Sequence, residues 1–221
     1  MIEAFGAVLP VAVAMALSPV PIIAVLLVLL APTGRAAGLC FAVGRLLGVA
    51  GVVGVFAVLS DGVELTDAGA PVVAVLRLLV GVTLMVLAAA KWRGRARSAE
   101  EATLPGWMGA IEGSSPARAL WVAILVSVAN PKELLLGVGA GLTIGSTGLP
   151  LGATLAVGAA YTAIACVSVV GPVVAFVAAP DSMRGRLQRL RLGLVRHNDA
   201  IMSVVLLVIG AALIGGGLSD F

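Results

Sequence analysis

Three ionisable residues inside long apolar tracts are the first candidates for chemistry. Lys132 and Glu133 are adjacent in "ANPKELLLGVGAG", and Arg45 lies within "FAVGRLLGVAGVVGV". Ionisable side chains inside a membrane segment are costly and mark substrate or proton pathways. The pattern predicts that Lys132 and Arg45 attract an anionic group and that Glu133 carries a proton or a cation.

The sequence also constrains how these charges are paired. Neighbouring residues point about 100° apart on a helix, so Lys132 and Glu133 are not expected to be each other's main partner. Glu133 is expected to pair with Arg45, which leaves Lys132 to face a cavity. The alternative is that all three form a buried network that only holds the helices together.

Two proline motifs interrupt apolar tracts at corresponding places. The first is "SPVP" (Ser18–Pro21) and the second is "NPKE" (Asn130–Glu133), displaced by 130 − 18 = 112 residues. Proline removes an amide donor and clashes with the carbonyl four residues back, so each motif predicts a broken helix. Carbonyls freed at a break cannot face lipid and must meet a side chain, water or substrate. The predicted cavity residues are Ser18, Pro19, Pro21, Asn130, Pro131, Lys132, Glu133 and Arg45.

Composition places these motifs in a membrane. The chain has 221 residues, of which 61% are hydrophobic and 11% charged, whereas soluble domains carry about 25% charged residues. The chain is therefore a polytopic, all-α membrane protein. The basic residues flank apolar runs, so the net charge of +3 reflects topology rather than nucleic-acid binding. One His, two isolated Cys and no nucleophile–base pair predict no metal, no cofactor and no enzymatic activity.

Six tracts are long enough to cross a bilayer, for which a helix needs about 20 apolar residues. They lie at about 4–31, 36–59, 70–90, 118–146, 150–178 and 199–218. The basic residues fall in alternate loops, opposite the acidic segment "DGVELTD" (61–67). The positive-inside rule therefore predicts an inner-membrane protein with both termini outside the cytoplasm.

The 112-residue displacement predicts an internal repeat. Adding 112 to 36–59 gives 148–171, close to the fifth tract. Three spans per half is an odd number, so the halves are predicted to be inverted, as in many secondary transporters. The chain is thus read as a single membrane domain, 1–221. Its parts are repeat one (1–90), a basic cytoplasmic loop (91–117) and repeat two (118–221).

Two further patterns concern surfaces. Residues 182–197 place Leu187, Leu190 and Leu194 on one helical face and arginines on the others. This predicts an amphipathic cytoplasmic helix at the membrane surface, serving either topology or lipid recognition. Gly44 and Gly48 have the spacing that lets helices approach closely. Their partner is either another span or a second copy of the chain, so a homodimer is one expected arrangement.

These motifs resemble the GAP family of peptidoglycolipid- or sulfolipid-addressing proteins in the LysE transporter superfamily. Ser18–Pro21 match the family's Ser-Pro-Val-Pro motif, and Asn130–Lys132 match its Asn-Pro-Lys motif, which leucines follow here too. Family members often have asparagine where this chain has Glu133. The departure adds a negative charge near the centre of the fourth tract.

The resemblance implies a secondary exporter for a cell-envelope glycolipid or another small anionic or zwitterionic solute. The substrate site is expected at the membrane midplane, between the first and fourth spans. The wider superfamily implies export of amino acids or cations as an alternative. A third hypothesis is a membrane scaffold that assists lipid-export machinery and transports nothing. Expected partners are the bilayer and a lipid or small-molecule substrate.

Overall fold

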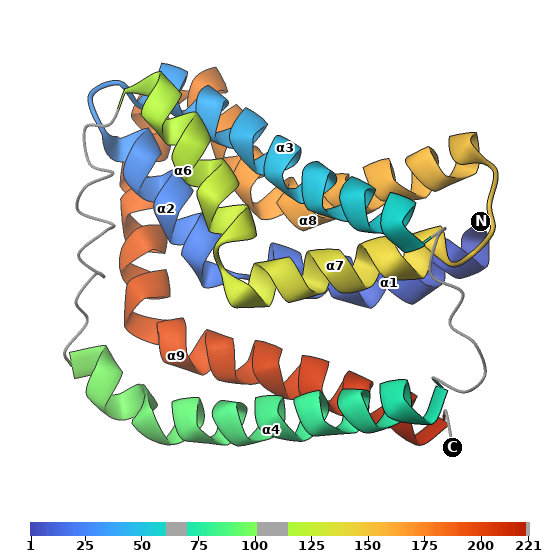
Figure 1. Cartoon of the computed structure of the whole chain (residues 1–221). Helices are drawn as coiled ribbons and strands as arrows, with labels where there is room; N and C mark the ends of the chain where they lie inside the picture. The colour runs from blue at the N-terminus through green and yellow to red at the C-terminus, as the bar shows by residue number, and fades with distance from the viewer. Residues whose placement is uncertain (61–69, 101–114, 220–221) are drawn as a thin grey trace. The chain divides into compact units, whose positions relative to one another are not determined.

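The computed structural model describes residues 1–60, 70–100 and 115–219, and within these ranges it contains helices and short connections but no strand (Figure 1). The all-α prediction is therefore confirmed for the described residues. The acidic segment 61–67 and part of the basic loop lie outside them. The helices are α1 (Ile2–Ala16), α2 (Pro19–Leu30), α3 (Gly34–Ser60), α4 (Ala70–Glu100), α6 (Pro116–Val128), α7 (Pro131–Gly145), α8 (Leu151–Ala178) and α9 (Pro180–Ser219).

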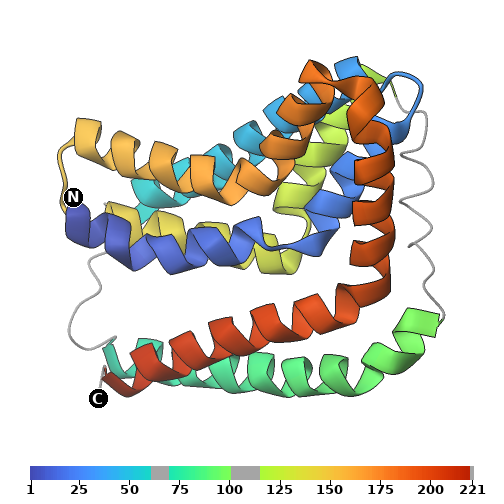
Figure 2. The ribbon, with the colours of Figure 1, turned by 180° about the vertical axis from the view of Figure 1, so that it is seen from behind.

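The chain divides into two compact units. The first comprises Met1–Gly62 and Leu104–Gly193, and the second comprises Val63–Thr103 and Leu194–Phe221. In the first unit α1 lies beside α7, and α3 runs along both α6 and α7 (Figures 1 and 2). Helix α8 packs against α1 and α2 and also against α3. The unbroken helix of each predicted half thus packs on the broken pair of the other half.

Both predicted helix breaks are present. The axis turns by 50° between α1 and α2 and by 70° between α6 and α7, and α2 and α7 each begin with proline. The first helical position is where proline costs least, because its missing N–H has no partner inside the helix. Each proline therefore ends one helix and begins the next, as its chemistry requires.

The helices are long and apolar enough for a membrane protein. Judged by length and composition, α3 and α8 each suffice to cross a bilayer, and the described residues offer up to five spans if each bent pair counts as one. The third bent pair lies within α9. The membrane-embedded character is thus confirmed, while six spans and the inverted repeat stay predictions.

Helix α2 forms the centre of the first unit. Every residue from Ile23 to Leu29 is buried, and α2 contacts α3, α6 and α8. A helix that is apolar on all sides is suited either to such an enclosed position or to contact with lipid. The second half of the first broken pair is therefore held on all sides by other helices.

Small residues set the close packing of α3 against α6 and α7. A Cβ added at Gly44 would overlap the Leu120 carbonyl of α6, and one added at Gly48 would lie 2.8 Å from Ser127 Cβ. From α7, a Cβ at Gly141 would lie 2.6 Å from the Val53 carbonyl oxygen of α3. The partner of the Gly44–Gly48 pair is therefore a helix of the same chain, which the sequence left open.

The second unit pairs α4 with the later part of α9. A Cβ added at Gly81 would meet Ile214 at 2.7 Å, and one added at Gly210 would meet the Gly81 carbonyl oxygen at 2.9 Å. Lys91 and Asp199 join the two helices through an ion pair of 2.9 Å, with the lysine side chain 48% exposed. Close backbone approach and one solvent-facing ion pair thus hold this unit.

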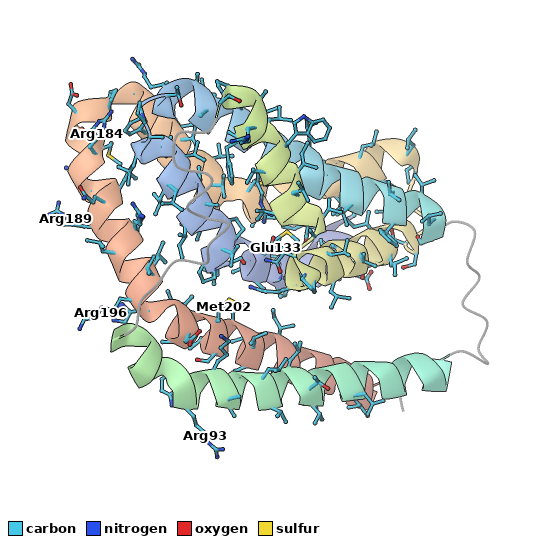
Figure 3. All side chains as sticks on the ribbon, turned by 60° about the vertical axis from the view of Figure 1, so that its left-hand side comes forward. Arg93, Glu133, Arg184, Arg189, Arg196 and Met202 are labelled. Atoms are coloured by element: carbon cyan, nitrogen blue, oxygen red, sulfur yellow. The ribbon has the colours of Figure 1, made fainter. Side chains whose placement is uncertain are left out.

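The predicted amphipathic segment 182–197 is helical and forms the first part of α9. Leu187 is buried, whereas Leu190 is 45% exposed. The Arg184 guanidinium lies 5.9 Å from the centre of the Phe176 ring. Figure 3 shows Arg189 projecting outward from this part of α9. The segment therefore has one buried leucine and an outward basic face, and its placement at a membrane surface stays a prediction.

Candidate functional site

The two helix breaks correspond position by position across the 112-residue displacement. The helix preceding each break ends at Ala16 in the first half and at Val128 in the second (16 + 112 = 128). The residue before each proline, Ser18 or Asn130, is extended, with φ and ψ of −71° and 118° or −80° and 113°. Extended geometry is what a following proline imposes on its predecessor. The same local chemistry has thus produced the same break twice.

The breaks differ in how their polar groups are satisfied. The Asn130 side chain accepts a hydrogen bond from the Lys132 backbone N–H, 3.2 Å away, and so caps α7. The Ser18 side chain makes no such cap, and its buried Oγ has no hydrogen-bond partner among the described residues. A buried polar atom without a partner is unusual and requires an explanation, such as a water molecule, an ion or a functional role. Ser18 is therefore the polar group at the first break that remains available.

Arg45 and Glu133 form a buried ion pair. Arg45 Nη2 donates to Glu133 Oε2, joining α3 to the first turn of α7, and the two side chains are 1% and 0% exposed. Arg45 Nη1 donates to Ser127 Oγ at 2.9 Å, and Ser127 in turn donates to the Ala123 carbonyl at 2.9 Å. The pairing expected from the sequence is present. Arg45 thus bridges α6 and α7 on either side of the second break.

Both partners of the ion pair have hydrogen-bonding atoms that the pair does not use. Arg45 Nε and Glu133 Oε1 are buried and have no hydrogen-bond partner among the described residues. Glu133 engages the guanidinium through one oxygen, whereas a bidentate pair uses two. The arrangement therefore holds one guanidinium nitrogen ready for a further acceptor.

Lys132 connects the second break to the first. Its Nζ lies 3.5 Å from the Ala14 carbonyl oxygen, in the last turn of α1. At this helix end the Ser18 N–H bonds to the Met15 carbonyl, so the Ala14 carbonyl has lost its usual i+4 partner. A cation at a helix C-terminus also complements the helix dipole. The lysine of the second half thus satisfies a carbonyl freed by the break in the first half.

The structure brings together the charged residues predicted from the sequence. Glu133 lies at the start of α7, where α6 turns into it (Figure 3). Arg45 pairs with it, and Lys132 reaches α1. The five remaining predicted residues lie at the two breaks: Ser18, Pro19, Pro21, Asn130 and Pro131. None of these contacts tests whether the group binds substrate, so the assignment stays a prediction.

Two residues of the cluster were missed in the sequence. Ser127 holds Arg45, and Tyr161 of α8 is buried with its hydroxyl 3.4 Å from the Leu136 carbonyl and 3.7 Å from Met15 Sδ. The 112-residue displacement gives no signal for Tyr161, which corresponds to Val49 (161 − 112 = 49). Ser127 and Met15 are equivalent under the displacement (127 − 15 = 112), and each receives a polar group from the unbroken helix of the other half.

The cluster carries a net positive charge. It holds two cations, Arg45 and Lys132, and one anion, Glu133; Arg45 and Glu133 are enclosed among the helices, and Lys132 is half-buried. A guanidinium binds carboxylate, phosphate or sulfate oxygens with matched geometry. No group of three or more His, Cys, Asp or Glu able to hold a metal ion occurs among the described residues. The arrangement is suited to binding an anion or moving a proton.

Comparison with known proteins adds one match. The model of a protein family described as Sap, sulfolipid-1-addressing protein (SfLAP), matches residues 8–219. Comparisons with curated proteins and with solved structures gave no match. The matched range includes both helix breaks and the charged cluster.

Proposed function

Because the chain belongs to the sulfolipid-1-addressing protein family, we propose that it is a secondary exporter of a cell-envelope glycolipid with an anionic headgroup. It has six spans in two inverted three-helix halves, belongs to the LysE superfamily and resides in the inner membrane with both termini outside the cytoplasm. The substrate site lies at the midplane, between the two broken helices. A small anionic or zwitterionic solute is the alternative cargo.

The observation that carries the proposal is the buried charge cluster at the second break. Arg45 and Glu133 are almost fully enclosed, although charges in the middle of a membrane protein are costly unless they serve a substrate or proton path. Transporters with inverted repeats place their sites where discontinuous helices meet. Here Lys132 links one break to the other. The cluster thus occupies the place where such a site is expected.

The two breaks have different parts in this proposal. Ser18 and the prolines of the first break carry no charge and shape the cavity. Lys132 and Arg45 attract the anionic headgroup, and Glu133 carries a proton or a cation. Movement at the two bends exposes the cluster to one side of the membrane and then to the other, because proline-broken helices provide the natural points for such movement.

The test is transport by the purified protein in proteoliposomes. The probe is a sulfated galactosylceramide with a fluorescent acyl chain, and dithionite quenching reports which leaflet it occupies. Lys132→Ala is expected to slow movement about tenfold or more, as loss of a charge-assisted contact does. Lys91→Ala, which removes the other lysine at an exposed ion pair, is the matched control. Wild-type transport by both Lys132→Ala and Glu133→Gln would refute the site assignment.

One observation favours a second function. The ion pair is fully enclosed, as expected of a network that only holds helices together. In that case the protein is a scaffold for a lipid-export complex and moves no lipid itself. The discriminating result is a protein that transports nothing in proteoliposomes, although deleting its gene removes a glycolipid from the cell surface.

A further inference from the structure

Glu133 occupies the position on Arg45 that an external anion needs. Its carboxylate accepts a hydrogen bond from the guanidinium inside a site closed to solvent. We propose that Glu133 is a built-in competitor of the substrate, and that the anionic headgroup binds Arg45 in its place when Glu133 takes up a proton. This inference rests on the proposed function and concerns the regulation of that same site.

The unused hydrogen-bonding capacity supports an exchange. Arg45 donates through Nη2 to one oxygen of Glu133 and through Nη1 to Ser127, while Nε has no partner among the described residues. A sulfate or phosphate can accept from Nε and Nη2 together, which is the side-on geometry of bidentate pairs. The incoming headgroup therefore makes one hydrogen bond more than the carboxylate that it displaces.

The charges of the cluster couple the exchange to a proton. With Glu133 ionised, its negative charge offsets one of the two cations, Arg45 and Lys132. Protonation alone leaves the buried Arg45 and the half-buried Lys132 without an anion. Headgroup binding alone places two anions on one guanidinium. Each event alone is penalised in a low-dielectric site, so proton uptake and headgroup binding favour one another.

The surroundings of Glu133 contain no second acid to take this proton among the described residues. Arg45 faces it from α3, and Lys132 precedes it on α7. From α8, Tyr161 and Cys166 interact electrostatically with the pair, and both are neutral groups in their ordinary state. The proton adds to a carboxylate oxygen of Glu133 and its salt bridge opens, with no covalent bond broken.

The experiment measures binding of a sulfated probe to the full-length protein in detergent. Tritiated sulfated galactosylceramide is bound in a scintillation-proximity assay at about pH 8 and about pH 5, where a typical carboxyl group is ionised or partly protonated. Unsulfated galactosylceramide is the control ligand. Glu3→Gln, which alters an exposed acid of α1, is the control variant.

Removing the negative charge is expected to strengthen binding. At the higher pH, Glu133→Gln binds the sulfated probe about tenfold more tightly than the wild type, within the usual range of coupling between sites. The wild type gains affinity on acidification, Glu133→Gln changes little, and Arg45→Gln binds weakly at both pH values. The unsulfated lipid and Glu3→Gln show no such differences.

Two results would overturn the inference. One is a folded Glu133→Gln variant that binds the sulfated probe no more tightly than the wild type. The other, which requires no variant to fold, is wild-type binding with no dependence on pH. If the wild type still transports lipid, either result refutes the competitor role of Glu133 but does not contradict the proposed exporter function. If the wild type shows the expected binding pattern but transports no lipid, the proposed exporter function is refuted and the competitor role of Glu133 stands.

Discussion

Removing Glu133 should destabilise the protein strongly, because it leaves Arg45 charged and buried. Of the two partnered nitrogens of Arg45, only Nη1 would keep its hydrogen bond, to Ser127. One lost hydrogen bond to a charged group costs about 1.5–3 kcal/mol. A buried charge left without its partner raises the cost to about 3–5 kcal/mol. We therefore expect Glu133→Ala to lower the folding equilibrium constant about 10²- to 10⁴-fold.

The assay is unfolding in mixed micelles of dodecyl maltoside and sodium dodecyl sulfate, followed by circular dichroism. Glu133→Ala, Arg45→Ala and the double variant form a cycle, in which contacting residues show a coupling of about 0.5–3 kcal/mol. The double replacement Arg45→Met with Glu133→Leu should be close to neutral, since apolar residues of similar volume can replace a buried pair.

A small effect would refute this reasoning. If Glu133→Ala costs less than about 1 kcal/mol, the pair behaves like one at a solvated surface, and the enclosure described above is wrong. Lys91→Ala gives the reference value, because it breaks an ion pair whose lysine is 48% exposed. That control should cost about 0–1 kcal/mol.

Three further predictions use the same unfolding assay. Gly44→Val should lower the free energy of unfolding by about 1–3 kcal/mol because its side chain would overlap α6. Gly51→Val, with nothing within 4 Å of an added Cβ, should lie within about 0.5 kcal/mol of the wild type. Equal effects of the two substitutions would contradict the packing of Gly44 against α6. Tyr161→Phe should cost about 0.5–1.5 kcal/mol through loss of its hydroxyl contact with the Leu136 carbonyl, and a variant as stable as the wild type would count against that bond. Leu187→Ala should cost about 2–5 kcal/mol as a buried truncation, and a loss no larger than that of a solvent-facing leucine would show that α9 is not packed here.

The breaks could be predicted from the sequence because proline acts locally, and the ion pair could be predicted because few charged residues lie within the spans. Proline at the start of α2 and α7 acts through its own ring and its missing N–H, so the breaks follow from covalent structure. Glu133 is the one acid near the middle of a predicted span, and Arg45 is the basic residue at similar depth apart from Lys132, the sequence neighbour of Glu133. Because a buried charge needs a counter-charge, few basic residues could pair with Glu133.

The remaining contacts of the cluster could not be predicted in this way. Ser127 and Tyr161 are ordinary residues for a membrane helix, and the hydrogen bonds that they make depend on how the helices pack against one another. The Lys132 contact with the Ala14 carbonyl depends on how the two breaks meet in space. Such contacts are set by packing register, which apolar sequence encodes weakly because Leu, Val and Ala fit many registers.

The sequence by itself determined that the chain is a helical membrane protein with two matched proline breaks and three charges near the middle of apolar tracts. These features follow from composition, chain length and the chemistry of single residues. Only the tertiary structure decided that Gly44 and Gly48 of α3 face α6 of the same chain and that Ser127 holds Arg45. It also decided that Ser18 Oγ has no hydrogen-bond partner among the described residues. The physical reason is that these outcomes depend on distances between helices far apart in the chain, which arise when the helices pack.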